Sequence, residues 1–581
     1  MFEEQPIHPI QILIDELKNE EIEVRLNAVR SLPEIAEALG PERTRTELVP
    51  FLSITISDSE DGVLVALAEQ LGSFGEFVGG KEYLPSLLDP LEQLAVAEDS
   101  VVREQAMIAL ESTCKDIPPE GITEHLLPII QRLGNGEWFT PRLAATIMIP
   151  FAAPKLSDQN LIDTLTLFAK LCDDNTPMVR REAQTQIAKL ASLTPKEPFL
   201  KLISPKFVSL SKDSQDSVRL LTVPNAIEIA KILNEEENIA HNILDTLLGC
   251  AADDAWRVRF MVADRLTEIC EAFGPQITEK HFVTAFTKLV GDVEPEVRTA
   301  ASGNVVAVCS RVSSELAMSE VIPSIKDLVV DPSEHVRVAL SKVIMDLAPI
   351  CGKENTKAHL VDLFLRLLQD EFSDVRLNII SKLSAVDNVI SVDLLEQALI
   401  PAIVHLAEDR QWRVRLAIIE HIPIMAKQLG VAYFDEKLSA LCFSLLNDPV
   451  FNVRTAATVN LRRLASLFGD DWVKGTLLPQ IGVLKENSNY LYRMTTLFSI
   501  KELATVVSPQ ILEESLLPFV FELAGDRVPN IRLNAVKTME VVHSNVSDGA
   551  KGKIVEQVGV LKGDVDGDVK AHAIGCKFGA A

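Results

Sequence analysis

Apolar residues along this chain recur at helical spacing in paired segments that a short polar turn separates. In residues 394–430 the first segment has the three- and four-residue steps of an amphipathic helix, at Leu395, Leu399, Ile403 and Leu406. A polar turn over residues 408–411 follows. A second stripe predicts a second helix, at Val414, Ala417, Ile418 and Met425. Gly430 suits the end of that helix, so the pattern predicts a helical hairpin.

This hairpin is repeated along the chain, and the dipeptide Val-Arg marks its second helix. The marker returns after 39 residues in most steps and after 38 or 40 in the others. Its second position is occupied by Arg25, Leu64, Arg103, Arg142, Arg180, Arg219, Arg259, Arg298, Arg337, Arg376, Arg415, Arg454, Arg493, Arg532 and Lys570. The period predicts 15 tandem hairpins over residues 1–581, with no room for a separate catalytic domain.

Two further residue types keep the same phase. An aspartate stands six residues before the arginine in most copies, as Asp174 and Asp448 do, and a proline stands fourteen residues before it in many, as Pro205 and Pro401 do. We expect the aspartate to cap the second helix and the arginine to bind an aspartate or carbonyl of the adjacent repeat, which would form a ladder. The proline removes a backbone donor, so we expect it to bend the first helix.

This Pro, Asp and Val-Arg phasing resembles the HEAT repeat. The resemblance implies an all-α fold in which helical hairpins stack into a right-handed superhelix and each repeat contacts only its neighbours. Composition agrees, because hydrophobic residues are 47% of the chain and aromatic residues only 5%. A core of Leu, Ile, Val and Ala favours many thin helical layers over a few large cores.

The formal net charge of −27 limits the class of partner. Proteins that grip nucleic acid present a basic stripe to the phosphates, and this chain would repel them. Anionic lipid would be repelled too, and no run of about 18 apolar residues offers a membrane span. We therefore expect protein partners, with no nucleic acid and no membrane.

The eight cysteines indicate a reducing compartment. None belongs to a Cys-x-x-Cys pair, and their scattered positions are typical of small buried hydrophobic residues. Residues 1–6 lack the pattern of a secretory signal. We expect a cytoplasmic protein, with the nucleus as a second compartment.

The sequence contains no recognisable catalytic motif. A P-loop, a Gly-x-Ser-x-Gly elbow, a His-Glu-x-x-His helix and an EF-hand loop are all missing. Carboxylate pairs such as Asp253–Asp254 and Glu408–Asp409 fall in the repeated turn, where a structural role explains them. We predict a protein that is not an enzyme, with no catalytic residues, no metal and no cofactor.

Aromatic residues stand out in turns that are otherwise polar. Trp256 and Trp412 occupy the same repeat position, Trp138 and Phe139 fall in a matching turn, and residues 490–494 contain two tyrosines. Exposed Trp, Tyr and Arg are the usual anchors of protein interfaces. The alternative is that each ring folds back onto the next repeat.

At these turns the sequence is similar to the scaffolding A subunits of protein phosphatase 2A, a family of HEAT-repeat proteins. The similar stretches run from the first repeat past the thirteenth: residues 14–19, 42–45, 67–72, 176–181, 215–221, 256–264, 374–381, 412–420, 434–438 and 493–498.

The resemblance implies a non-catalytic scaffold that joins a catalytic phosphatase subunit to variable B-type regulatory subunits in a heterotrimer rather than a homo-oligomer. It places the catalytic subunit on repeats within 400–581, at Trp412, Arg413, Phe451, Tyr490, Leu491, Tyr492, Arg493, Met494, Val528 and Asn530. It places regulatory subunits on repeats within 1–320, at Glu98, Asp99, Trp138, Phe139, Asn175, Thr176, Pro177, Arg181, Trp256 and Arg257. Two positions depart from the family pattern: Phe451 lacks the expected phenolic hydroxyl, and Tyr492 replaces a histidine.

Two other functions fit a HEAT-type chain. A nuclear-transport receptor of the importin-β type would use an acidic arch for basic cargo, but its repeats are less regular and its chain is normally longer. A base-excision glycosylase built on HEAT-like repeats needs a basic groove with a catalytic carboxylate, which the charge of −27 disfavours.

Overall fold

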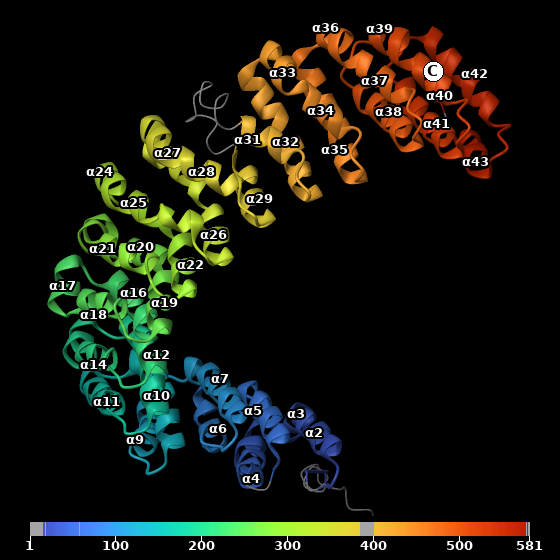
Figure 1. Ribbon diagram of the computed structural model, residues 1–581. Helices are drawn as coiled ribbons and strands as arrows, with labels where there is room; N and C mark the ends of the chain where they lie inside the picture. The colour runs from blue at the N-terminus through green and yellow to red at the C-terminus, as the bar shows by residue number, and fades with distance from the viewer. Residues whose placement is uncertain (1–15, 18, 57–58, 384–399, 577, 579–581) are drawn as a thin grey trace, which may run out of the picture. The chain divides into compact units, whose positions relative to one another are not determined.

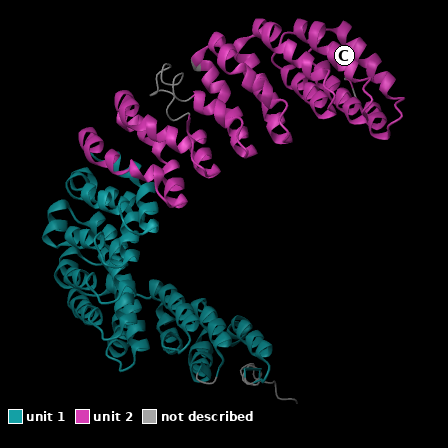
Figure 2. Cartoon of the chain, in the orientation of Figure 1, with its two compact units in different colours: residues 1–312 teal, residues 313–581 magenta. Residues whose placement is uncertain are grey.

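The computed structural model describes residues 16–17, 19–56, 59–383, 400–576 and 578. Every regular element in these residues is helical (Figure 1), which confirms the predicted all-α class. The chain divides into two compact units, Met1–Val312 and Ser313–Ala581 (Figure 2). The right-handed sense of the predicted superhelix stays a prediction.

The helices of unit 1 form successive hairpins, and several members of these hairpins are divided into shorter helices. They are α2 (Ile22–Arg30), α3 (Leu32–Arg43), α4 (Val49–Thr55), α5 (Asp61–Gly72), α6 (Leu88–Ala95), α7 (Ser100–Asp116), α8 (Pro119–Gly121), α9 (Leu127–Gly134), α10 (Phe139–Ala152), α11 (Asp158–Leu171), α12 (Pro177–Leu193), α13 (Lys196–Pro198), α14 (Ser204–Leu210), α15 (Asp216–Arg219), α16 (Thr222–Ile232), α17 (Glu235–Ala240), α18 (Ile243–Cys250), α19 (Trp256–Asp264), α20 (Leu266–Ile277), α21 (Val283–Val290), α22 (Pro295–Gly303) and α23 (Val305–Cys309).

Unit 2 continues the same alternation. Its helices are α24 (Ser314–Leu316), α25 (Ile322–Ser324), α26 (Glu334–Ser341), α27 (Leu347–Asn355), α28 (Val361–Leu368), α29 (Ser373–Ser381), α31 (Ile400–Leu406), α32 (Trp412–Leu429), α33 (Val431–Lys437), α34 (Ser439–Leu445), α35 (Phe451–Phe468), α36 (Asp470–Trp472), α37 (Leu478–Lys485), α38 (Tyr490–Leu503), α39 (Pro509–Ile511), α40 (Leu517–Leu523), α41 (Pro529–His543), α42 (Asp548–Leu561) and α43 (Gly567–Gly575).

The second helices of successive repeats pack side by side within each unit. In unit 1 this row includes α5, α7, α10, α12 and α16, and in unit 2 it runs α26, α29, α32, α35, α38, α41 and α43 (Figure 1). Leu, Ile, Val and Ala fill the layers between helices, as the composition predicted. Seven cysteines are buried and reduced, and burial raises the pKa of Cys114 to about 12.

The repeated prolines stand where the first helix passes from π-helical to α-helical backbone, and the predicted bend there stays a prediction. Pro50, Pro128 and Pro205 each occupy the first turn of an α-helix that follows a π-helical turn, at Thr44–Leu48, Ile122–Leu126 and Phe199–Ile203. The proline lacks the N–H that would continue the backbone hydrogen bonds of the helix, and the wider π-helical turn lies just before it. The turn before Pro401 lies outside the described residues.

The repeated arginine and aspartate form the predicted ladder. The Nε and Nη2 groups of Arg180 donate to the carboxylate of Asp213 in the next repeat at 2.6 and 3.0 Å, and Nη1 donates to the carbonyl of Asp174 in its own repeat at 2.8 Å. The same partners pair in unit 1 as Arg142–Asp174, Arg219–Asp253 and Arg259–Asp292, and in unit 2 as Arg337–Asp370, Arg376–Asp409, Arg415–Asp448, Arg493–Asp526 and Arg532–Asp564.

The prediction that these aspartates cap the second helix is wrong. Asp174 precedes the N-cap residue Thr176 by two positions, and its Oδ1 accepts the backbone N–H of Thr176 at 2.8 Å. Asp448 accepts the N–H of Val450 in the same way. The short aspartate side chain closes the turn, and it also faces the arginine of the preceding repeat.

Breaking one rung of the ladder is expected to destabilise unit 2. The side chains of Arg415 and Asp448 are 12% and 4% exposed, so Asp448→Ala leaves a largely buried guanidinium without its carboxylate. We expect a loss on the order of 3 kcal/mol and faster hydrogen–deuterium exchange in α32 and α35. The exposed pair Lys81–Asp116 supplies the control, because solvent screens an exposed ion pair and Asp116→Ala should therefore destabilise the protein much less. Equal effects of the two variants would contradict a stabilising ladder.

The ladder is also expected to make stability fall in acid. The hydrogen bond from Arg532 holds the pKa of Asp564 below its ordinary value, and burial opposes this only in part. A lowered pKa contributes stability that is complete above the unfolded pKa of about 3.9 and is lost as the pH falls through the folded value. Urea unfolding between about pH 6 and about pH 3 should show the decline below about pH 4. Arg532→Met should make the decline shallower, and an unchanged slope in that variant would contradict the assignment.

Candidate protein-interaction surface

The ladder holds the turn between the two helices of each repeat, and the residues in between project outward. We call the residues from the repeated aspartate to the first residue of the second helix the turn segment. Within it Val293 is 84% exposed and Val565 is 98% exposed, although each directly follows a ladder aspartate. The aspartate and the arginine at the two ends of the turn make the hydrogen bonds that hold it. The fold therefore does not depend on the side chains between them.

Unit 2 carries aromatic rings at the same turn position in three consecutive repeats. Trp412, Phe451 and Tyr490 are the first residues of α32, α35 and α38, which pack in that order. Phe451 is 53% exposed, Tyr490 is 40% exposed, and Trp412 is half-buried. Phe451 makes an edge contact with Phe498 of α38 at 6.1 Å between ring centroids. We call Trp412, Phe451 and Tyr490 the aromatic row.

The other predicted contacts in unit 2 divide between surface and support. Arg413 is exposed and its guanidinium carbon lies 4.8 Å from the centroid of the Trp412 ring, while Asn530 is exposed in the first turn of α41. Three more are half-buried: Leu491, Tyr492 and Val528. Arg493 and Met494 are only 8% exposed. Arg493 is a ladder arginine bonded to Asp526. Arg493 and Met494 therefore lie beneath the aromatic row and offer a partner little exposed area.

Unit 1 carries two separate aromatic sites. Trp138 is 76% exposed as the N-cap residue of α10, and Phe139 beside it is half-buried. Trp256 begins α19, and its half-buried indole makes an edge contact with Phe260 at 6.4 Å. The guanidinium carbon of Arg257 lies 4.9 Å from the Trp256 ring centroid. Neither indole is sunk in the core, so both remain available to a partner.

The remaining predicted positions of unit 1 are polar turn residues. Four of them are exposed: Glu98, Asn175, Pro177 and Arg181. Asp99 caps α7 by accepting the N–H groups of Val101 and Val102 at 2.8 and 3.2 Å. The hydroxyl oxygen of Thr176 accepts a long hydrogen bond of 3.4 Å from Arg142. Asp99 and Thr176 therefore have a structural task whatever else they contact.

Sequence reasoning missed two of the most exposed apolar residues in the turn segments, Val293 and Val565. The available signal was an apolar residue directly after a ladder aspartate, at a place where most repeats are polar. Sequence reasoning weighed only the aromatic residues there.

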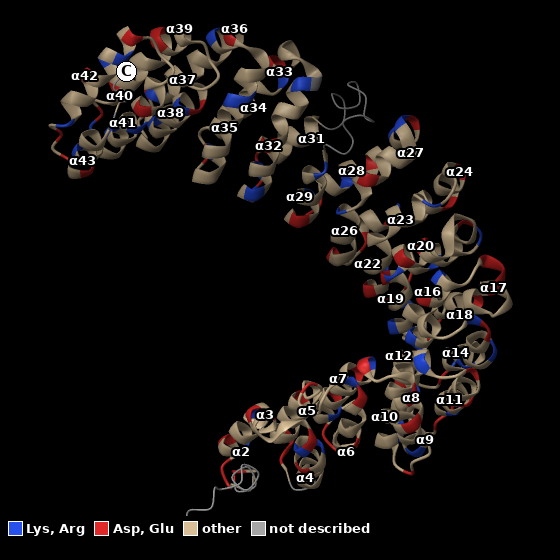
Figure 3. Cartoon of the chain, turned by 180° about the vertical axis from the view of Figure 1, so that it is seen from behind, with Lys and Arg blue, Asp and Glu red and all other residues tan. Residues whose placement is uncertain are grey.

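Charges of both signs are distributed along the helices of both units (Figure 3). Many of the basic residues are already engaged, because the ladder arginines are paired with aspartates. Within the described residues no helix is both long and apolar enough to cross a bilayer.

Known proteins with similar sequences are described as HEAT-repeat proteins and as subunits of protein phosphatase 2A. A family model described as HEAT repeats matches residues 10–111, and one described as PPP2R1A-like HEAT repeat matches residues 275–352. The regulatory A subunit of protein phosphatase PP2A from Schizosaccharomyces pombe is 43% identical over 274 residues, 47% of this chain and 46% of that protein. The protein phosphatase 2A scaffold subunit of Dictyostelium discoideum is 48% identical over 290 residues, 50% of each chain. The matches thus span about half the length of these curated relatives.

Among solved structures, yeast importin-β (Kap95p) is similar with a TM-score of 0.53, over 97% of this chain and 82% of that one. Its sequence identity of 15% supports a shared fold alone, which agrees with the predicted class of helical-repeat solenoid. The relatives in sequence are named as regulatory or scaffold subunits, not as catalytic ones. Two stretches of the chain thus match HEAT-repeat family models, and about half of it is similar in sequence to A subunits of protein phosphatase 2A.

Proposed function

We propose that this protein is the non-catalytic scaffold of a serine/threonine phosphatase holoenzyme of the protein phosphatase 2A type. The observation that carries the proposal is its 37–48% identity to proteins named as A or scaffold subunits of that enzyme. A scaffold acts by raising the effective concentration of one partner near another and needs no chemistry of its own. In this role the chain holds a B-type regulatory subunit next to the catalytic one.

The catalytic subunit is assigned to the aromatic row. Rings that are 40% and 53% exposed at the start of consecutive helices offer a contiguous apolar strip, with Arg413 beside it. Such aromatic and arginine anchors carry most of the binding energy in protein interfaces. The ladder fixes the turn backbone beneath Trp412 and Phe451, so little ordering of these turns remains to be done on binding.

Regulatory subunits are assigned to Trp138 and Trp256 with their polar neighbours in unit 1. These two sites lie on α10 and α19, with other repeats between them, in contrast to the adjacent rings of unit 2. Separated anchors suit a partner that spans several repeats. The exposed residues Glu98, Asn175 and Arg181 would then supply the polar rim.

An importin-β-type transport receptor is the alternative function. The similarity to yeast importin-β is one of fold, at 15% identity, and does not by itself favour transport. Capture of a Ran-type GTPase instead of a phosphatase catalytic subunit from cell extract would support this alternative.

The two assignments predict that alanine variants of two equivalent tryptophans affect different partners. The full-length chain is expected to bind the purified catalytic subunit, and Trp412→Ala should weaken this binding by about 2 kcal/mol or more, because hot-spot anchors lose that much on truncation. Trp256→Ala should weaken regulatory-subunit binding and leave catalytic-subunit binding unchanged. Calorimetry or surface plasmon resonance with each subunit measures both.

Val483→Ala is the matched control, since Val483 is 69% exposed but lies on a first helix, α37, away from the turn segments. Loss of the same partner in both tryptophan variants would disprove the division between the units. Failure of the wild-type chain to bind a catalytic subunit would disprove the proposed function.

A second prediction separates surface tryptophan from core tryptophan. Trp138→Ala should change the free energy of unfolding by less than about 0.5 kcal/mol and still weaken regulatory-subunit binding, because its ring is 76% exposed. Trp472→Ala should cost about 3–5 kcal/mol, because its ring is 5% exposed and its Nε1 donates to Asp435 at 2.8 Å. Chemical denaturation and binding assays on the same preparations test both. A strongly destabilising Trp138→Ala would show that this indole belongs to the core.

A further inference from the structure

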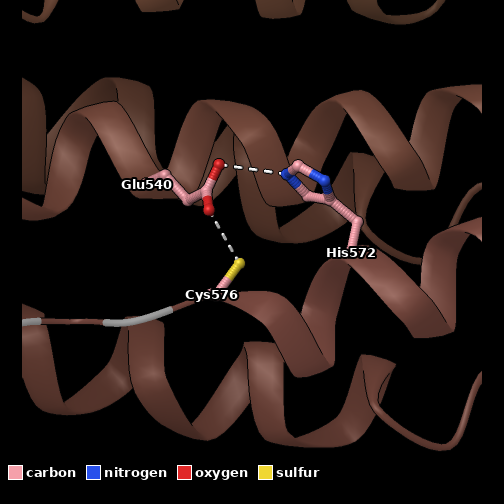
Figure 4. Close-up of side chains that lie close together, drawn as sticks. All are labelled: Glu540, His572 and Cys576. Carbon is pink, nitrogen blue, oxygen red and sulfur yellow. Dashed lines mark hydrogen bonds and ion pairs between the residues drawn. The ribbon is translucent and has the colours of Figure 1, made fainter.

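Three side chains of different chemistry meet between α41 and α43 (Figure 4). Glu540 lies on α41, and His572 and Cys576 lie four residues apart at the end of α43. Nε2 of His572 lies 3.1 Å from Oε2 of Glu540, and Sγ of Cys576 donates to Oε1 of Glu540 at 3.0 Å. The carboxylate thus faces the imidazole with one oxygen and the thiol with the other (Figure 4).

The three potential ligand atoms all lie within 4.8 Å of one another. Tetrahedral zinc holds sulfur at about 2.3 Å and nitrogen or oxygen at about 2.0–2.2 Å, which places neighbouring ligand atoms about 3–4 Å apart. Side-chain movements of about 1 Å would therefore suffice to surround an ion. Cys576 is the C-cap residue of α43, and its backbone N–H donates to the carbonyl of His572 at 3.1 Å, so the two side chains lie one turn apart at the end of the helix.

The cluster opens onto a shallow cavity of about 450 Å³. Glu540 and His572 line it together with Lys537, Asp568 and Gly575. A ligand can therefore reach the Glu540 carboxylate and the His572 imidazole from solvent, with Cys576 behind them. The cavity leaves room for a fourth ligand, either water or the carboxylate of Asp568, which lies one turn before His572 on the same helix.

We propose that Glu540, His572 and Cys576 form a binding site for one zinc ion that ties α43 to α41. A thiolate, an imidazole and a carboxylate together suit zinc better than calcium or magnesium, which prefer oxygen ligands alone. On binding, the Cys576 thiol loses its proton to solvent, which ends its hydrogen bond to Glu540. The Cys576 thiolate and the Glu540 carboxylate then each coordinate the ion. One proton is released per ion bound at this cysteine.

The sequence predicts no metal, and the proposed site departs from that prediction. The other seven cysteines are buried, whereas Cys576 is half-buried and lies beside two further ligand groups. Burial and the neighbouring Glu540 carboxylate raise the pKa of the Cys576 thiol to about 12, so the metal-free site holds it protonated. The His572–Cys576 spacing was readable in the sequence, but Glu540 stands 32 residues before His572 and only the fold brings it in.

The test uses the full-length chain, stripped of metal with a chelator and titrated with Zn²⁺ and with Co²⁺ as a spectroscopic probe. We expect one Zn²⁺ per chain in calorimetry, with proton release that appears as a dependence of the heat on the buffer. Co²⁺ should give the thiolate charge-transfer band in the near ultraviolet. Cys576→Ser, His572→Asn and Glu540→Gln should each weaken Zn²⁺ binding at least about tenfold, because each removes one ligand of the proposed site.

His125→Asn is the matched control, because it removes an exposed histidine of unit 1 that is distant in sequence from the proposed site. It should leave Zn²⁺ binding unchanged. Cys576→Ser keeps a hydrogen-bond donor to Glu540, so it should fold without metal. A measurement on the wild-type chain does not depend on any variant: Zn²⁺ should slow hydrogen–deuterium exchange in α43. Equal Zn²⁺ binding by the wild-type chain and Cys576→Ser, or unchanged exchange in α43, would overturn the proposal.

Discussion

The structure depends on a carboxylate that serves two repeats at once. Each ladder aspartate closes its own turn by accepting a backbone N–H, and it also receives the guanidinium of the preceding repeat. The arginine in turn donates to a carbonyl of its own turn. A planar guanidinium can make these contacts together, and a lysine cannot. Local turn geometry and stacking of neighbouring repeats are therefore linked by a single residue pair within each unit.

Two of the repeats that lack the ladder aspartate show that the stack tolerates its loss. Gly136 and Asn487 stand where most repeats have an aspartate. The arginines of the preceding repeats, Arg103 and Arg454, donate to backbone carbonyls of their own turns. Hydrophobic burial between the helices holds such layers together when the aspartate is missing, because residues such as Val453 are fully buried whatever charge lies nearby.

Because the ladder holds the turn backbone, the residues between the aspartate and the arginine are available to contact a protein partner. The same repeat position is proline in α12 and α22 and an aromatic residue in α19, α32, α35 and α38. Variation there costs the fold little, since these side chains are exposed or half-buried. A scaffold can thus change its partner contacts one repeat at a time while the ladder stays constant. Like a ladder pair, the cluster of Glu540, His572 and Cys576 joins the second helices of two neighbouring repeats, but it does so with a carboxylate, an imidazole and a thiol.

The sequence by itself determined the all-helical class, the 39-residue period, the Arg–Asp ladder and the aromatic positions in the turns, because each is a local pattern repeated in register. It could not determine that Arg493 and Met494 are buried while Tyr490 is exposed, because exposure depends on how the next helix packs. It also misassigned the aspartates as caps, since N-capping and turn closure use the same residue type two positions apart. Only the tertiary structure brought Glu540 to His572 and Cys576, because side chains on different helices meet through packing, which local spacing does not reveal.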